Sequence, residues 1–343
     1  MQYRNVGRSG LQVSVAGLGC NNFGMVIDEA QAERVVQTAI DAGINLFDTA
    51  DMYGAGASEE SLGKALGARR SEVLIATKFR RPMGEGPLNN GGSRRYIYNA
   101  VEASLRRLGT DYIDLFQYHD LDPLTPLEET LEALTDLVRE GKVRYIGSSN
   151  LTGWQIADAD WMSRSNHWSR FVSVQREWSL VNRGVETEVV PSCEEFGVGI
   201  IPFMPLASGF LTGKYQRGEA LPEGSRFDLW ERGADKSPDW LVQPHKNRVA
   251  LWTSGGMFDR LEALTAFAEE HGHSMLELAL CWMASMPAVS SVISGATKPE
   301  QVTANVEALN SWTLSAEELA GVDRASATAG APDGARPAVG SPG

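Results

Sequence analysis

Four side chains that suit proton transfer follow short apolar runs of this chain. Asp48 ends INLFD, Tyr53 lies five residues later, Lys78 directly follows VLIAT, and His119 closes DYIDLFQYH. Hydride addition to a carbonyl carbon builds negative charge on oxygen, which needs a proton donor. A tyrosine can be that donor if a lysine lies beside it, because a cation favours the phenolate. Asp48 would hold Lys78 charged and oriented, His119 could donate a hydrogen bond to the substrate oxygen, and this chemistry needs no metal.

Taken singly, each of these residues has an ordinary structural alternative. Asp48 could be a turn or N-cap residue, Tyr53 a loop aromatic, and Lys78 or His119 a structural group at a strand end. The functional interpretation therefore depends on whether the fold brings the four together.

Short apolar runs alternate with longer amphipathic segments along the chain, which predicts repeated βα units. The expected strands are Val15–Leu18, Ile44–Phe47, Val73–Thr77, Tyr112–Gln117, Val143–Ile146, Phe171–Val174, Val198–Ile201 and Val289–Ile293. The clearest helical segments are Glu29–Ala42, Arg94–Leu108, Leu127–Glu140, Thr152–Ala159 and Val185–Phe196. Eight such units predict an α/β fold of the (β/α)8 TIM barrel type, in which the carboxyl ends of the strands form one functional face.

An open, doubly wound dinucleotide-binding sheet is the alternative architecture, and its glycine fingerprint is missing. GLGCNN lacks the third glycine, and GAGASE places Glu59 where a helix should pack closely on the strand.

Two segments fall outside the repeat. Residues 216–256, after the seventh strand, are rich in Gly, Pro, Asp and Trp, which predicts a long irregular loop that acts as a lid carrying Trp230, Trp240 and Trp252. Residues 325–343 are mostly Ala, Gly, Pro and Ser and predict a disordered tail. We therefore expect one domain over residues 1–324.

Composition excludes several classes of function. The 343 residues carry a formal charge of -13, which disfavours nucleic acid as a partner. The apolar runs are too short to span a bilayer and no signal region is present, so a cytoplasmic location without a membrane partner is expected. Cys20, Cys193 and Cys281 stand singly, without the spacing of a metal site.

The chain resembles the aldo-keto reductase family over nearly its whole length, from GLGCNNFG to the segment after the eighth strand. The family's Asp, Tyr, Lys and His tetrad falls on Asp48, Tyr53, Lys78 and His119, in the settings FDTADMYG, IATKF and FQYHD. The resemblance implies reduction of an aldehyde or ketone to an alcohol with NADP(H) in a TIM barrel.

The resemblance also locates the cofactor. It implies that Ser149, Asn150 and Gln175 hold the nicotinamide carboxamide, with Trp178 in the place of the usual tyrosine that stacks on the ring. PLASGFLTGKY resembles the pyrophosphate loop, with Leu206, Ala207, Gly209, Leu211 and Lys214 in matching positions. SGATKPEQVTAN resembles the adenosine site, with Gly295, Thr297, Lys298, Gln301 and Asn305 corresponding.

Physical reasoning supports the same placement, because phosphate sites in βα barrels commonly form after strands seven and eight. Lys298, with Pro299 as the expected first helical residue, suits a phosphate on the adenosine ribose and so NADP over NAD. A solvated lysine at a helix start is the alternative for Lys298.

Asn21, Phe23, Phe79 and the tryptophans of residues 216–256 are candidates for the substrate pocket, with loop packing as the alternative for each. The arginines of residues 80–95 could meet an anionic substrate or simply be solvated. Two other functions stay open: a non-catalytic NADP(H)-binding regulatory subunit, as in potassium-channel β subunits, and a reductase for a keto or enone group of a sugar nucleotide. The sequence names neither the physiological substrate nor the oligomeric state.

Overall fold

Eight parallel strands form one sheet in the computed structural model, which describes residues 1–234 and 239–327. In chain order they are β3 (Ala16–Gly19), β4 (Leu46–Asp48), β5 (Leu74–Phe79), β6 (Ile113–Tyr118), β7 (Val143–Ser149), β8 (Phe171–Gln175), β9 (Gly199–Ile200) and β10 (Val292–Gly295). Each overlaps one of the eight strands expected from the sequence. Neighbours in the sheet follow chain order, with β10 beside β3.

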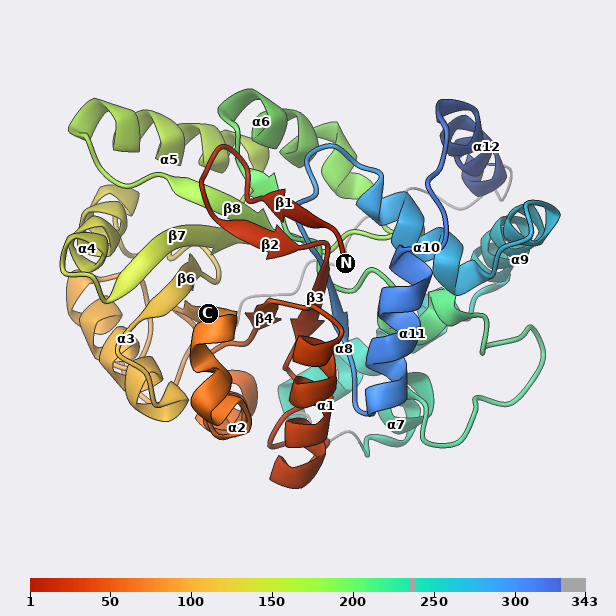
Figure 1. Ribbon diagram of the computed structural model, residues 1–343, viewed down its shortest axis with the longest axis horizontal. Coiled ribbons are helices and arrows are strands. Elements are labelled where there is room, and N and C mark those ends of the chain that lie inside the picture. The colour runs from red at the N-terminus through yellow and green to blue at the C-terminus, as the bar shows by residue number, and fades with distance from the viewer. Residues whose placement is uncertain (235–238, 328–343) are drawn as a thin grey trace. The chain divides into compact units, whose positions relative to one another are not determined.

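Figure 1 shows the sheet curling round from β3 and β4 through β6 and β7 to β8. Parallel bridges join Ile200 to Val289 and Phe203 to Ile293, so the segment around β9 pairs with the segment around β10. The predicted (β/α)8 barrel is therefore confirmed.

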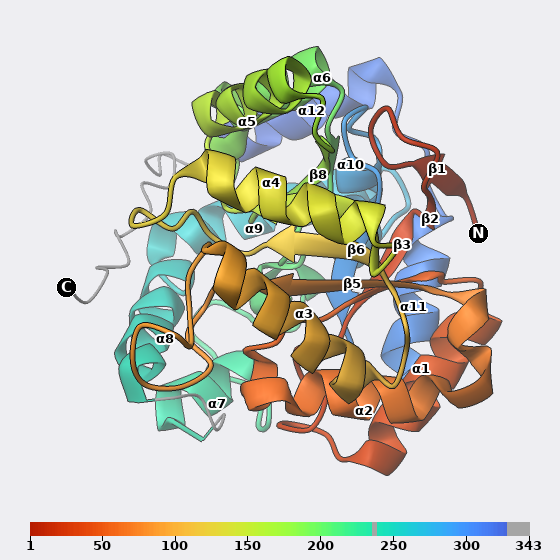
Figure 2. The same ribbon diagram turned by 90° about the vertical axis from the view of Figure 1, so that its left-hand side faces the viewer.

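Helices cover the outside of this sheet. They are α1 (Glu29–Asp41), α2 (Ala57–Leu66), α3 (Arg94–Leu108), α4 (Leu127–Arg139), α5 (Gly153–Asn166) and α6 (Val189–Phe196). Figure 2 shows α3 and α4 lying across β5 and β6. Capping decides where several begin and end: Asp28 and Gln31 form a capping box at the start of α1, and Gly109 ends α3 in the left-handed conformation.

The interior of the barrel changes from apolar to polar along its strands. Leu46, Ala76 and Leu115 belong to one buried apolar cluster. Successive side chains of a strand point to opposite faces, so the residues two positions further on point inward as well. At those positions β4, β5 and β6 carry Asp48, Lys78 and Gln117. The two-residue period therefore delivers polar groups to the carboxyl ends of the strands.

An N-terminal hairpin that the sequence analysis did not anticipate packs on the apolar end of the same interior. Strands β1 (Tyr3–Asn5) and β2 (Gln12–Ser14) pair antiparallel. Val6, Leu11 and Val13 join the buried cluster that contains the inward residues of the barrel strands.

The described chain divides into two compact units. The barrel unit comprises Met1–Glu177, Val185–Phe203 and Pro287–Val306; the second unit takes Trp178–Gly184, Met204–Met286 and the chain from Glu307. Helices α9 (Gly255–Glu270), α10 (Met275–Ala284) and α12 (Ala316–Ala327) lie in the second unit, and α11 (Pro299–Leu309) begins in the barrel unit. The expectation of one domain over residues 1–324 stays a prediction.

Residues 216–256 are not irregular throughout, and this part of the sequence-based prediction is wrong. They contain α7 (Arg226–Arg232) and α8 (Asp239–Trp252). Ser225 caps α7 and Gly233 ends it, but a helix of two turns is too short to show a clear period. Pro244 lies inside α8, where composition alone favours a loop.

At the C-terminus, α12 extends to Ala327 and so includes the first residues of the predicted tail, while residues 328–343 lie outside the described part. Among the helices of the described segments, none is both long and apolar enough to span a membrane.

Candidate functional site

Lys78 and Asp48 form a buried ion pair at the polar end of the barrel interior. Lys78 is fully buried, and its Nζ donates to Asp48 Oδ1 at 2.7 Å and to the carbonyl oxygen of Thr49 at 2.8 Å. Burial lowers the pKa of Lys78, but the charge of Asp48 and the contact with Tyr53 outweigh burial, so the pKa lies above its ordinary value. Lys78 therefore remains charged at neutral pH.

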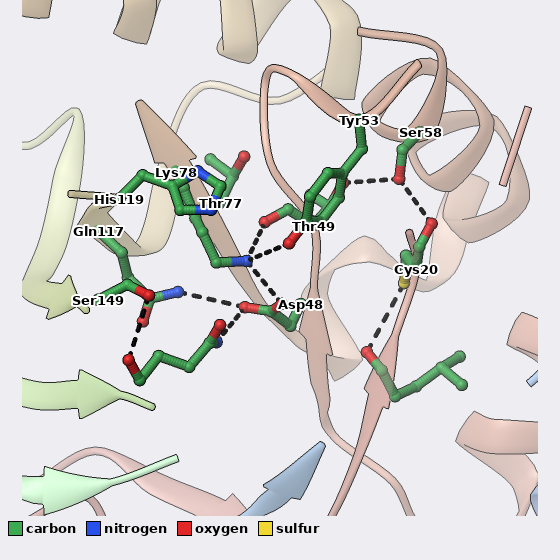
Figure 3. A network of polar contacts seen from close by, with 12 residues as sticks. Cys20, Asp48, Thr49, Tyr53, Ser58, Thr77, Lys78, Gln117, His119 and Ser149 are labelled. Carbon is green, nitrogen blue, oxygen red and sulfur yellow. Dashed lines mark hydrogen bonds and ion pairs between the residues drawn. The ribbon is translucent and has the colours of Figure 1, made fainter. Parts of the chain in front are cut away.

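Tyr53 lies on the other side of the same ammonium group. Its hydroxyl is 3.4 Å from Lys78 Nζ, and that nitrogen is 5.0 Å from the centre of the tyrosine ring (Figure 3). Burial raises the pKa of Tyr53, and the charge of Lys78 opposes this rise without cancelling it. The lysine thus acts in the expected direction, while the net pKa is raised because burial is the larger effect.

His119 completes the predicted group of four. The centre of its ring is 6.1 Å from that of Tyr53, at an interplanar angle of 86°. Burial, followed by the charges of Arg81, Lys78 and Arg80, lowers the pKa of His119 well below its usual value. The imidazole is therefore neutral at physiological pH, and its buried Nδ1 has no hydrogen-bond partner within the described residues.

Gln117, which orients Asp48, was not among the site residues expected from the sequence. Nε2 of Gln117 and Nε2 of Gln175 donate to Asp48 Oδ2, at 3.2 and 2.6 Å. Asp48 Oδ1 is thereby left to Lys78. The available signal was strand periodicity, because Gln117 stands two residues before His119 in the run DYIDLFQYH.

A second buried ion pair supports the strand that carries Lys78. Glu59 of α2 is fully buried; its Oε1 accepts from the hydroxyl of Thr77 and its Oε2 from Arg107 Nε, both at 2.6 Å. Gly56 makes this possible, because a Cβ there would lie 2.6 Å from Cδ of Arg107. The sequence indicated only that Glu59 does not fit a dinucleotide fingerprint.

The residues expected to hold the nicotinamide carboxamide lie beside this network. Ser149 donates its hydroxyl proton to the carbonyl oxygen of Gln175 at 3.1 Å. Nδ2 of Asn150, a residue in the left-handed conformation, donates to the carbonyl oxygen of His119 at 3.1 Å. The barrel unit thus brings Ser149, Asn150 and Gln175 together with the tetrad.

Trp178 has a different environment from the one expected. Its ring is 1% exposed and packs edge-on against Trp282, with ring centres 5.9 Å apart. Trp178 therefore packs against protein in this structure, and its contact with the nicotinamide stays a prediction.

The predicted pyrophosphate loop belongs to the second unit and has an unusual backbone. Ala207, Ser208 and Gly209 are three successive residues with positive φ. Two features require glycine at position 209. Its φ of 93° is unfavourable for other residues, and a Cβ there would lie 2.7 Å from Lys214 Nζ. Partial burial of the Lys214 ammonium and the positive charge of Arg226 both lower the pKa of Lys214. Two cations that repel each other suit a site for a doubly charged anion.

The other residues expected in that loop differ in exposure, since Ala207 and Leu211 are buried and Leu206 is only partly buried.

The predicted adenosine segment begins α11 at Pro299, as the sequence indicates. Oε1 of Gln301 accepts from the backbone amides of Thr297 and Lys298, at 2.8 and 3.2 Å, and so caps the helix. Lys298 and Gly295 are exposed and Asn305 is partly buried.

The candidate pocket residues divide between exposed and packed positions. Asn21 is exposed, whereas Phe23 is fully buried. Phe79 stacks on Phe116 and Tyr118, with ring centres 4.7 and 5.4 Å away, which favours the packing alternative for Phe79.

Aromatic packing also engages Trp230 and Trp252. Both are 4% exposed, lie in the second unit and contact the ring of Phe227. The side chain of Trp240 lies outside the described residues. At the start of residues 80–95, Arg81 pairs with Asp120 at 2.5 Å.

Comparison with known proteins agrees with this geometry. The model of the aldo/keto reductase family matches residues 16–327. A probable voltage-gated potassium channel subunit beta of Oryza sativa subsp. japonica is 37% identical over 324 residues, which cover 93% of this chain and 94% of that protein. The L-glyceraldehyde 3-phosphate reductase of Escherichia coli O157:H7 is 36% identical, covering 94% of this chain and 92% of its own.

The versiconal hemiacetal acetate reductase of Aspergillus parasiticus is 37% identical, covering 87% of this chain and 90% of that protein. With a family match over most of its length and relatives of this similarity, the chain belongs to the aldo/keto reductase family and is an oxidoreductase.

Proposed function

We propose that this enzyme reduces an aldehyde or ketone to an alcohol with NADPH, and that Tyr53 is the proton donor. The observation that carries the proposal is the chain of contacts from Asp48 through Lys78 to Tyr53, with Nζ 2.7 Å from the carboxylate and 3.4 Å from the hydroxyl. A phenol next to a buried ammonium that is charged at neutral pH is a group that can release a proton to a developing alkoxide.

Each residue of the tetrad has one task in this proposal. Tyr53 transfers its proton to the carbonyl oxygen of the substrate, and Lys78 stabilises the phenolate that remains. Asp48 keeps Lys78 charged and directed at Tyr53. His119, neutral because its pKa is lowered, donates an N–H hydrogen bond to the same oxygen and fixes its position.

A reduced nicotinamide bound at this site would supply the hydride, as is general in the family. The residues present fit such a group, because Oε1 of Gln117 is buried without a hydrogen-bond partner in the described chain and could accept from a carboxamide. Ser149, Asn150 and Gln175 supply further hydroxyl and amide groups next to it. Lys214, Gly209 and the adjoining backbone would hold the diphosphate, and Lys298 the ribose phosphate of NADP(H).

Two specific observations keep other functions in view. A relative is named as a probable potassium channel subunit beta, so a regulatory NADP(H)-binding subunit remains the second candidate. Another is named L-glyceraldehyde 3-phosphate reductase, which places phosphorylated small aldehydes in the first substrate panel. Sugar-nucleotide keto or enone compounds form a third substrate group.

Oxidation of NADPH in the presence of these carbonyl compounds tests the proposal, with Tyr53→Phe as the critical variant. We expect the variant to bind NADPH as the wild type does and to lose most of its turnover, by about 100-fold or more. An undiminished rate in Tyr53→Phe would show that another group donates the proton. Turnover on none of the compounds, with tight NADPH binding, would favour the regulatory subunit.

The coenzyme preference can be tested separately at Lys298. Replacement by Met should weaken NADPH binding by about tenfold and leave NADH binding unchanged, because only the first carries the ribose phosphate. Equal weakening of both would place Lys298 elsewhere in the cofactor site, and no effect on either would favour a solvated lysine.

A further inference from the structure

Asp51 is a buried carboxyl group that has no role in the mechanism proposed for the tetrad. Its side chain is 1% exposed, and neither carboxyl oxygen makes a well-formed hydrogen bond within the described residues. Its backbone N–H donates to the carbonyl oxygen of Lys78 at 3.2 Å, and it stands two residues before Tyr53. Asp51 is thus attached by its backbone to both residues of the proposed proton-donating pair.

Among the described residues, the two cations that act on Asp51, Lys78 and Arg107, are each paired with another carboxylate. Lys78 is engaged by Asp48 and by a backbone carbonyl, and Arg107 is engaged by Glu59. A buried carboxylate without an ion-pair partner of its own is strongly disfavoured. The arrangement therefore favours the neutral, protonated acid.

The groups around Asp51 have opposing effects on its ionisation. Burial is the largest effect and raises its pKa, and Glu59 of α2 raises it further. The backbone amide of Met52, Arg107 of α3 and Lys78 of β5 lower it, and the sum places the pKa at about 8. Tyr96 of α3 also faces Asp51, but burial raises the pKa of Tyr96 well above its usual value, so its phenol stays neutral across this range.

We propose that Asp51 is a positioning residue of the reductase site that stays uncharged at neutral pH, and that its ionisation under mildly alkaline conditions makes Tyr53 a weaker acid. The inference rests on the proposed role of Tyr53. With Asp51 neutral, Asp48 is the carboxylate whose charge opposes the effect of Lys78 on Tyr53. Once Asp51 is ionised, a second negative charge balances Lys78, and the phenolate of Tyr53 becomes harder to form.

Two matched variants test this, Asp51→Asn and Asp111→Asn. Asn has the shape of the neutral acid and cannot ionise, whereas Asp111 is exposed on the turn before β6. Infrared spectra of the wild type and of Asp111→Asn should contain a protonated carboxyl band that disappears with a midpoint near pH 8. The band should be missing from Asp51→Asn. Its absence from the wild type at pH 6 would overturn the proposal.

The effect on Tyr53 is measured by NMR of protein labelled with 13C at the tyrosine Cζ, with Tyr53→Phe to assign the signal. In Asp51→Asn, Tyr53 should ionise at lower pH than in the wild type, and in Asp111→Asn at the same pH as in the wild type. This measurement needs no substrate. Identical titrations of Tyr53 in all three proteins would overturn the proposal even if Asp51 itself titrates near pH 8.

The pH dependence of kcat/KM also tests the proposal, because a purely structural role of Asp51 would not change it. For the best carbonyl substrate, kcat/KM of the wild type should fall above pH 8, and at pH 9 Asp51→Asn should be about threefold to tenfold faster than the wild type. Parallel pH profiles would contradict the inference. If no compound is turned over, the proposed function fails, while the infrared and NMR titrations still decide the role of Asp51.

Discussion

Replacing Asp48 by Asn tests the central ion pair, because it removes one charge and almost no volume. Asp48 is 4% exposed. One of its carboxylate oxygens accepts from Lys78, and the other accepts from the side-chain amides of Gln117 and Gln175. An asparagine has only one acceptor oxygen, so it cannot satisfy both sides. In either orientation of its side-chain amide, the asparagine leaves Lys78 without a carboxylate partner.

The expected cost follows from the burial of Lys78. Removing one partner of a buried ion pair destabilises by about 3 to 5 kcal/mol. Lys78 can limit the cost by losing its proton, because every tenfold change in proton affinity between the folded and unfolded states corresponds to about 1.4 kcal/mol.

The sign of the pH dependence follows from proton binding. In the wild type the folded pKa of Lys78 is raised, so the stabilisation is complete below 10.5 and is lost only as the pH rises through the folded value. In the variant burial is no longer offset, and the folded pKa lies below 10.5. The unfolded variant then binds more protons than the folded one, so its stability increases with pH. The deficit relative to the wild type should shrink towards alkaline pH.

Urea unfolding at about pH 6.5 and about pH 9.5 measures this difference. Asp114→Asn is the matched control, because Asp114 pairs with Arg70 at 2.7 Å and both side chains are largely buried. A guanidinium does not lose its proton, so the deficit of the control should be the same at both pH values. A deficit of Asp48→Asn that is independent of pH, or below about 1 kcal/mol, would refute the reasoning.

Three further substitutions test the supporting structure by thermal unfolding. Glu59→Gln leaves a buried guanidinium without its carboxylate and should cost about 3 kcal/mol, so a loss below about 1 kcal/mol would contradict the assigned pair. Gly147→Ala places a Cβ 2.3 Å from a serine hydroxyl and should cost about 1 to 3 kcal/mol, whereas Gly184→Ala meets no atom within 4 Å and should be neutral. Ser274→Ala removes a capping box and should cost about 1 kcal/mol, whereas Ser254→Ala should cost little because Ser254 makes no side-chain cap bond; equal losses would show that capping is not the cause.

Much of the fold could be predicted because each element has a strong local signal. The eight apolar runs all correspond to strands, and Pro299 begins a helix where its restricted φ suggests. Helix α7 escaped prediction because two turns give too few residues for a period. The hairpin of β1 and β2 escaped because strands of three residues carry little pattern.

The candidate site was predictable to a similar depth. Asp48, Lys78 and His119 stand where apolar runs end, so their types and positions were visible. Gln117 lies inside such a run, and only the structure shows that its amide donates a hydrogen bond to Asp48. Asp51 carried no recognisable signal in the sequence, because only the fold buries its carboxyl group.

The sequence by itself determined which residues of each strand alternate between its two sides and where each strand ends. Both features depend on residues that are close together in the chain. Only the tertiary structure decided which charges are paired. Glu59 and Arg107 are far apart in the sequence, as are Asp48 and Gln175, and only folding brings each pair into contact. The pairing of Arg107 with Glu59 leaves Asp51 without a cation of its own. The acidity of the site therefore depends on which charges are buried together, and burial is a property of the assembled barrel.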